Sequence, residues 1–406
     1  MAKSNSYGWL IVALCFLGLS VTMSARASLG LTMPVFEADL GWSRSFISSA
    51  GAATLVVVAL VAPMAGNALD RFGPRVLLTL GLVAAALGLS LVSTMDAKWQ
   101  LILFFGVVSA IGFGTVANHV VSTTIALHFD ENRGLATGIA TAGSTAGQLL
   151  LVPLLAVVLS TAGWRSSYLA MGLAALALAP VFWLLIRSRD PSAARAHAAT
   201  VEPLGRRLGL LVRSPVFHAL FWSFTICGFT TSGVIETHLI PYAIVCGFPP
   251  LDSATAYGVL SGFNMLGMMA AGYLADRVHR PLLLGLIYIF RGLAFVLLMQ
   301  IVGDYKLLLI FAVAFGVFDY STVPVTASLV ASHLGLRIMG LTIGILSAGH
   351  ALGGAAGAFL GGYFFDLFAR YDWVWLASIG LALVAGLICF TIRETRQPLR
   401  LQPQPA

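Results

Sequence analysis

Charged side chains are scarce in this sequence, because Asp, Glu, Lys and Arg make up only 10% of its 406 residues. A soluble globular domain carries roughly 25% charged residues, since its surface must be hydrated. Hydrophobic residues make up 59% of the chain, and the mean hydropathy is +0.93. These values exclude an ordinary soluble fold and indicate a chain that lies mostly in lipid.

Cysteine is rare as well. The four cysteines lie in or beside apolar segments and have no paired spacing: Cys15, Cys227, Cys246 and Cys389. This arrangement indicates neither a disulfide framework nor a zinc site. The sequence also contains no HExxH or CxxC pattern and no nucleophile–base arrangement. We therefore expect no enzymatic activity, no metal and no cofactor.

Long apolar runs are what the sequence has in abundance. Each run reaches or exceeds the roughly 20 residues that a helix needs to cross a hydrocarbon core of about 30 Å. A helix also satisfies its own backbone hydrogen bonds in lipid. The sequence therefore predicts an all-α integral membrane protein with twelve transmembrane helices, near residues 9–33, 45–69, 76–95, 99–125, 135–160, 166–187, 216–242, 252–275, 281–302, 305–331, 338–366 and 373–393.

The positive charges are distributed unevenly between the predicted loops. Sixteen Lys and Arg residues lie in the tails and in the loops after even-numbered helices, against five in the opposite loops. Positive residues collect on the cytoplasmic side of a membrane. We therefore expect a multi-pass protein of the bacterial cytoplasmic (inner) membrane with both termini cytoplasmic. The net charge of +7 then reflects topology and indicates no nucleic-acid partner.

The chain contains an internal repeat. Shifting it by 206 residues aligns Gly143 with Gly349 and Gly147 with Gly353. Asp70-Arg71 aligns with Asp276-Arg277 in the same register. The sequence therefore predicts two pseudo-symmetric six-helix halves, at 1–187 and 215–406, joined by a polar cytoplasmic linker at 188–214.

A loop motif of the form Gly-x-x-x-Asp-Arg-x-Gly-x-Arg follows the second predicted helix and recurs in part in the second half. With the twelve helices and the repeat, it makes the chain resemble the major facilitator superfamily over nearly its whole length. The resemblance implies two halves that rock around a midplane substrate site. It also implies that the motif latches the halves on the cytoplasmic side; alternatively, its arginines only mark topology. The motif residues are Gly66, Asp70, Arg71, Gly73, Arg75, Asp276 and Arg277.

Residues 128–143 resemble the signature of the monocarboxylate porters, near the oxalate–formate branch. The small residues Gly138, Ala142 and Gly143 in this segment are also suited to close helix packing. The chain departs from these porters in the eighth predicted helix, because Met268 stands where they carry a substrate-binding arginine. Asn264 occupies the position four residues earlier, and we expect it to contact substrate. The substrate anion must then find a positive charge elsewhere, or the substrate is not a simple carboxylate.

Four ionisable residues of fixed type lie within predicted helices, away from the helix ends: Arg26, Glu236, Arg291 and Asp319. A charge at the bilayer centre costs at least about 2.5 kcal/mol, so each is expected to face a partner inside the protein. Arg26 and Glu236 have equal depth near the outer side, which predicts a gate or substrate site; a static ion pair is the alternative. Arg291 and Asp319 are both near the midplane, which predicts a structural bridge. Asp319 and Glu236 are also candidates for proton coupling.

Polar residues at helical spacing indicate further cavity-facing positions. Asn118 and His119 lie on one polar face of the fourth predicted helix, and His119 titrates in the range that proton coupling needs. His350 lies in the eleventh predicted helix, where the oxalate-type porters carry a basic residue. Each histidine is expected to contact substrate, or to be a satisfied donor between helices. His119 is also a candidate for proton coupling.

These features together predict a proton-coupled symporter of small organic anions, with monocarboxylates as the expected class. It would work in the bilayer as a monomer, with protons as the coupling ion. One alternative is proton-driven efflux of an amphipathic compound. The other is a transporter-like sensor that moves no substrate.

Overall fold

The computed structural model describes residues 5–126, 128–129, 133–187, 204–275, 277–335 and 338–394, and its regular elements in these ranges are helices. Ten of the helices are long and apolar enough to cross a membrane, and the pair 205–212 and 215–245, bent by 83°, is an eleventh candidate. One of the ten, at 136–185, has 50 residues. At 1.5 Å per residue it exceeds twice the thickness of a bilayer core, and it breaks at Gly163 with φ 77°, so it forms two spans. This division gives the twelve predicted spans.

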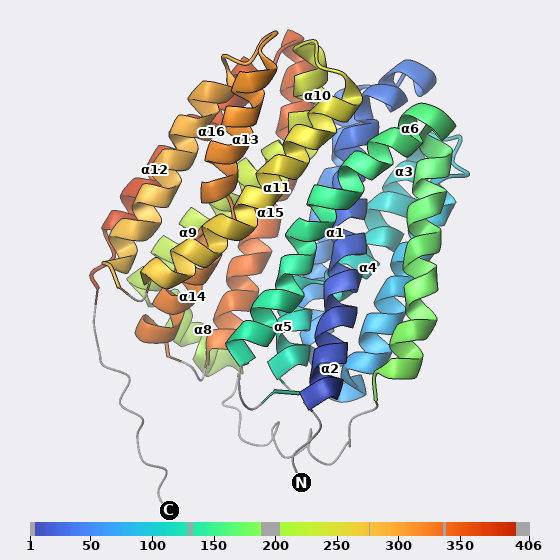
Figure 1. Cartoon of the computed structure of the whole chain (residues 1–406). Helices are drawn as coiled ribbons and strands as arrows, with labels where there is room; N and C mark the ends of the chain where they lie inside the picture. The colour runs from blue at the N-terminus through green and yellow to red at the C-terminus, as the bar shows by residue number, and fades with distance from the viewer. Residues whose placement is uncertain are drawn as a thin grey trace, which may run out of the picture.

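The first half consists of seven helical elements (Figure 1). A left-handed glycine, Gly73 with φ 77°, separates the two spans of α2. In chain order the elements are α1 (Asn5–Leu40), α2 (Arg44–Val92), α3 (Lys98–Leu101), the π-helix η1 (Ile102–Ser109), α4 (Ala110–Thr115), α5 (Asn118–Ala126) and α6 (Arg133–Leu185).

The second half repeats this arrangement and contains a second π-helical segment in its first span. Its elements are α8 (Leu204–Val212), α9 (Pro215–Gly228), the π-helix η2 (Phe229–Ile235), α10 (Glu236–Val245), α11 (Pro250–Ala275), α12 (Arg280–Leu298), α13 (Tyr305–Phe318), α14 (Thr322–His333), α15 (Met339–Phe368) and α16 (Asp372–Phe390).

The two halves lie side by side in Figure 1, with the blue-to-green half beside the yellow-to-red half. We call the end at which α1 begins and α16 ends the inner end, and the opposite end the outer end, after the predicted topology. The equivalent glycines Gly147 and Gly353 pack in the same way in the two halves. A Cβ atom at Gly143 or Gly147 would collide with the α1 backbone, and one at Gly353 with the α9 backbone, whereas Gly138 has open space around it. The predicted small-residue seam therefore holds for Gly143, and its extension to Gly138 is wrong.

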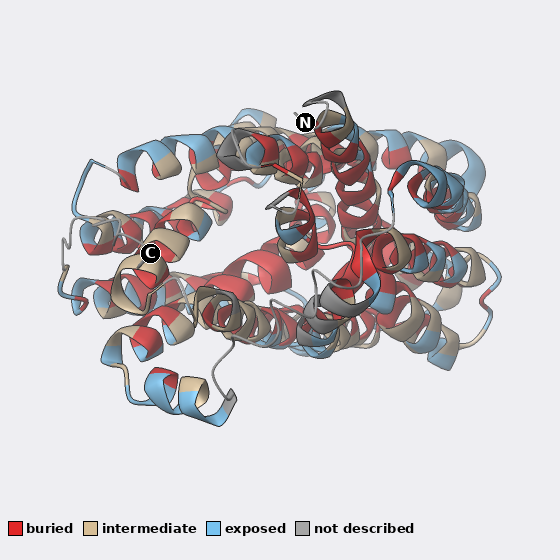
Figure 2. Cartoon of the chain, turned by 90° about the horizontal axis from the view of Figure 1, so that it is seen from below, coloured by how far each residue is buried: buried red, intermediate tan, exposed pale blue. Residues whose placement is uncertain are grey.

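Exposed residues line the outer rim of the helix ring in Figure 2, which views the molecule from the inner end. Many of the exposed residues in the described part of the chain are large and apolar, such as Leu184, Met64 and Leu150. A soluble protein rarely exposes so much contiguous apolar surface. The rim is therefore the surface that faces lipid.

The C-terminal end of the predicted linker forms a helix, although the linker was predicted from its polarity. Residues 188–203 lie outside the described part of the chain, but residues 204–212 form the amphipathic helix α8. Leu211 of this helix packs into the apolar core of the second half, while Leu210 and Val212 are exposed.

Candidate functional site

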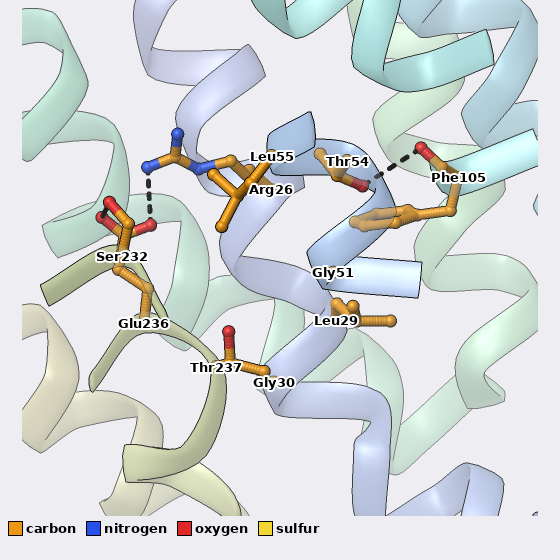
Figure 3. Close-up of a pocket in the computed structure, with 10 residues that line it drawn as sticks. All are labelled: Arg26, Leu29, Gly30, Gly51, Thr54, Leu55, Phe105, Ser232, Glu236 and Thr237. Atoms are coloured by element: carbon orange, nitrogen blue, oxygen red, sulfur yellow. Dashed lines mark hydrogen bonds and ion pairs between the residues drawn. The ribbon is translucent and has the colours of Figure 1, made fainter. Parts of the chain in front are cut away.

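An ion pair joins the two halves between α1 and α10. Nη2 of Arg26 lies 2.5 Å from Oε2 of Glu236, and only 16% and 8% of the two side chains are exposed. Figure 3 shows the two side chains pointing toward each other across the interface. The helix backbones touch about one turn further along α1, since a Cβ atom at Gly30 would lie 2.8 Å from the carbonyl oxygen of Thr237. This close approach lets the pair form directly.

Glu236 is held by two further donors within its own half. Tyr320 donates its hydroxyl to Oε1 at 2.5 Å, and Ser232 donates to the same oxygen at 3.2 Å. Ser232 lies in the π-helix η2, which ends immediately before Glu236. Single π-helical turns within α-helices occur frequently at functional sites. The carboxylate is therefore fixed in place by one cation and two hydroxyl groups.

A small cavity adjoins the ion pair. Its volume is about 20 Å³, room for about one water molecule. Among the described residues, Nε of Arg26 has no hydrogen-bond partner. The lining comes from both halves (Figure 3): Arg26, Leu29, Gly30, Gly51, Thr54, Leu55, Phe105, Ser232, Glu236 and Thr237. An organic acid does not fit in this volume.

The tenth span is broken where it carries its acid. α13 ends at Phe318 and α14 begins at Thr322, with Asp319 in between. Asn264 of α11 bridges the break, because its Oδ1 accepts the Tyr320 N–H at 3.0 Å and its Nδ2 donates to Asp319 Oδ2 at 3.2 Å. Asp319 is 2% exposed, and its Oδ1 has no hydrogen-bond partner among the described residues. Asn264 thus holds the segment that aims Tyr320 at Glu236.

The predicted side-chain bridge between Arg291 and Asp319 is wrong. Arg291 donates instead to the backbone carbonyls of Phe318, at 2.9 Å, and of Asp319. These two bonds come from Nη2, whereas Nη1 of the same guanidinium donates to Cys227 Sγ at 2.9 Å and to Thr231 Oγ1 at 3.2 Å. The physical reason is the break in the tenth span, since it frees carbonyls that an intact helix would have bonded.

The fourth span is also interrupted, at Val116–Ala117 between α4 and α5. Asn118 is exposed and His119 half-buried just after the interruption, and neither is among the described hydrogen-bond partners of Glu236. The hydroxyls of Thr115 and Ser122 donate back to carbonyls of their own span at 2.7–3.0 Å. The hydroxyl groups on the polar side of this span are therefore satisfied by carbonyls of the span itself.

Two other predicted positions lie in the second half. His350 is half-buried beside the Phe224 ring, with ring centroids 4.8 Å apart. Met268, at the position of the porters' arginine, is half-buried on α11. The structure describes neither as part of the hydrogen-bonded group around Glu236. The predicted contact of His350 with substrate stays a prediction.

The motif after the second span is described in part. Arg277 lies over the Tyr273 ring at 3.5 Å, and Arg75 lies over the Trp183 ring at 4.2 Å. Asp276 lies outside the described residues. Asp70 and Arg71 belong to α2, as does Gly66, and of these only the backbone is described. The predicted inner latch therefore stays a prediction.

Sequence reasoning missed Tyr320 and Ser232. Ser232 carries a usable signal, since it lies four residues before Glu236 on one helical face. Tyr320 carries none, because its reach to Glu236 depends on the break in the tenth span.

A sequence model of the Major Facilitator Superfamily matches residues 15–303 and 265–406, which together include nearly the whole chain. The chain belongs to the major facilitator superfamily. This family consists of membrane transporters, so the protein is a multi-pass membrane transporter for a small molecule. The predicted fold of twelve spans in two halves is confirmed.

The chain is similar to several curated family members along most of their length. It is 27% identical to the uncharacterized MFS-type transporter YcxA of Bacillus subtilis, covering 97% of this chain and 98% of that protein. It is 27% identical to human monocarboxylate transporter 11, covering 95% and 82%, and 24% identical to rat monocarboxylate transporter 13, covering 94% and 88%.

A solved structure shares the fold. It is a bacterial homolog of the human lysosomal transporter Spinster, in an inward-facing, unoccupied conformation. The TM-score is 0.74 at 15% identity, covering 96% of this chain and 97% of that one.

Proposed function

We propose that this transporter carries small organic anions together with protons by rocker-switch alternating access, with monocarboxylates as the expected substrates. The similarity to proteins named monocarboxylate transporters supports this class. The ion pair between Arg26 and Glu236 carries the proposal, because it places an anion-binding cation and a proton acceptor in one partly shielded site. Arg26 supplies the positive charge that Met268 does not.

The coupling follows from the charge balance of this site. Glu236 neutralises Arg26 when no substrate is bound. A substrate carboxylate takes the place of Glu236 on Arg26 only when Glu236 takes up a proton, since two carboxylates against one cation in a water-poor site repel each other. The proton and the anion therefore load together, and the net charge of the site stays the same.

Asp319 is the second proton site of the proposal. Its carboxyl is buried, accepts a hydrogen bond from Asn264, and forms no ion pair among the described residues. Burying a carboxylate without an ion pair is costly, so we propose that this group carries a proton during the transport cycle. Asn118, His119, Asn264 and His350 are further proposed substrate contacts. We place the transporter in the bacterial cytoplasmic membrane as a monomer with both tails cytoplasmic.

The test is internal acidification of dye-loaded proteoliposomes when lactate, pyruvate, longer aliphatic acids or aromatic acids are added outside. The signal of one acid class should exceed that of empty liposomes, which corrects for passive acid diffusion. Arg26→Ala and Glu236→Gln should abolish the excess, whereas Glu394→Gln, in a distant ion pair with Arg280, should keep it. An unchanged signal in Arg26→Ala, or no excess with any acid, would contradict the proposal.

A further inference from the structure

The first turn of α2 donates hydrogen bonds to the other half of the molecule. The backbone N–H groups of Arg44 and Ser45 donate to Oδ1 and Oδ2 of Asp366 at 3.1 and 2.9 Å. The next N–H, of Phe46, donates to Ser43 Oγ, which is the cap within the same half. A helix N-terminus has unpaired N–H groups and a partial positive charge, so a carboxylate there is favourable. Asp366 near the end of α15 is therefore a cap supplied across the interface.

The backbones of the two helices touch at this point. A Cβ atom at Gly362, one turn before Asp366 on α15, would lie 2.6 Å from the carbonyl oxygen of Arg44. The Asp366 carboxyl is attached to a short side chain, so it reaches the α2 N–H groups only when the helix ends are in contact. The two hydrogen bonds thus report on closure of the outer end.

The side chain of Arg44 adds to the same contact. Its guanidinium lies 3.7 Å from the centre of the Phe365 ring and donates to the Tyr371 hydroxyl at 3.0 Å. Only 6% of this side chain is exposed. The Tyr371 hydroxyl lies 3.2 Å from Nδ1 of His238, whose Nε2 donates to the carbonyl of Ala358 at 2.8 Å. Arg44 therefore inserts its side chain into a buried polar cluster of the second half, formed by Tyr371 and His238, next to the capped turn.

We propose that Asp366 is a positioning residue of the transport cycle, which holds the outer end closed by capping α2 of the opposite half. The cap forms when the outer ends meet and breaks when the site opens to the outside. Its loss therefore favours the outward-open state. The proposal rests on the alternating access proposed above, and on neither the substrate nor the proton.

A matched control lies at the same end of the molecule. Asp304 caps α13 by accepting the Leu307 N–H at 3.1 Å, and both residues belong to the second half. Removing this cap lowers stability without separating the halves. The pair Asp366→Ala and Asp304→Ala thus distinguishes a role in closure from a role in helix stability.

The experiment measures distances between spin labels on Thr94→Cys and Val302→Cys in proteoliposomes, by pulsed electron double resonance. These exposed positions lie in outer turns of different halves, and the four native cysteines are buried. Asp366→Ala should raise the ratio of long to short distances by between about twofold and thirtyfold, as expected for loss of a helix cap. Asp366→Asn, which retains one acceptor oxygen, should give a smaller rise.

Asp304→Ala should leave the distance distribution unchanged while lowering the thermal midpoint of unfolding. An unchanged distribution in Asp366→Ala would overturn the proposal, and so would an equal shift in Asp304→Ala. The measurement needs no substrate. If the protein transports no carboxylate, the proposed function is refuted. The distance measurement still tests the role of Asp366, because it does not depend on the substrate.

Discussion

The two halves share one fold, yet they carry different chemistry at the point where they meet. The 206-residue repeat makes Arg26 equivalent to Ser232 and Gly30 equivalent to Glu236. These four residues line the same cavity. Arg26 and Glu236 form one diagonal pair of this group, and this pair is charged. Gly30 and Ser232 form the other pair, which is small and uncharged and lets the helices approach. The comparison shows that equivalent positions of a symmetric scaffold meet at this site, and that only one of the two diagonal pairs is charged.

The remaining intramembrane charges extend this asymmetry. The first half contributes Arg26 to the interior of the predicted spans, whereas the second contributes Glu236, Arg291 and Asp319. The positions equivalent to Arg291 and Asp319 in the first half are Ala85 and Phe113. In the proposed function, proton handling therefore belongs to the second half.

Breaking the ion pair between Arg26 and Glu236 should have the largest effect on stability. Arg26→Ala leaves Glu236 without its cation and should destabilise the fold by about 3 kcal/mol. The double variant Arg26→Ala/Glu236→Gln should recover most of this loss, because no buried charge is then unpaired. Chemical unfolding in detergent measures both. A double variant as unstable as Arg26→Ala would contradict the pairing.

The next prediction concerns the break in the tenth span. Arg291→Met should destabilise the protein by about 2 kcal/mol, because carbonyls of Phe318 and Asp319 lose their charged donor. Asp319→Asn keeps its backbone carbonyl and should cost less than about 1 kcal/mol. Thermal unfolding of both variants compares the two. Equal losses would instead support a bridge through the Asp319 carboxylate.

The broken spans of the two halves should differ in function. Asp319→Asn should flatten the dependence of uptake on external pH, since a buried proton site is lost. His119→Ala, in the interrupted fourth span of the first half, should retain that dependence even where it weakens substrate binding. Initial uptake rates across a series of external pH values test this. A flat profile in His119→Ala alone would assign proton handling to the first half.

An ion pair away from the cavity should have the smallest effect. Arg280 Nε lies 2.7 Å from Glu394 Oε1, and this guanidinium lowers the pKa of the Glu394 carboxyl. A lowered pKa stabilises the fold above the unfolded-state value, and the contribution is lost as pH falls through the folded-state value. Glu394→Gln should therefore cost at most about 1 kcal/mol near neutral pH and nothing in acid. A loss that persists in acid would contradict this assignment.

Hydropathy, charge placement and the repeat predicted the helical spans, because these properties are local in the sequence. Equal depth predicted that Arg26 and Glu236 are neighbours, since 1.5 Å per residue converts position into height. The same argument was wrong in detail for Arg291. Position along a helix gives only the depth of a residue in the membrane and does not identify its hydrogen-bond partner. The acceptors of Arg291 are carbonyls that a break in the tenth span leaves free.

The outer cap was beyond the reach of sequence reasoning. Asp366 and Arg44 are 322 positions apart, and each by itself is an ordinary residue at a helix end. Only the contact of the two helix ends makes them partners. The same holds for Tyr320, whose hydroxyl reaches Glu236 across 84 positions.

The most direct test of the central claim is the number of protons that the purified protein takes up when it binds a transported acid. Binding is followed in weakly buffered solution with a pH indicator and, in parallel, by calorimetry. The exchange of Glu236 for substrate on Arg26 predicts proton uptake on binding, and no uptake at this site in Glu236→Gln. Substrate binding to the wild-type protein without proton uptake, or equal uptake in Glu236→Gln, would contradict it.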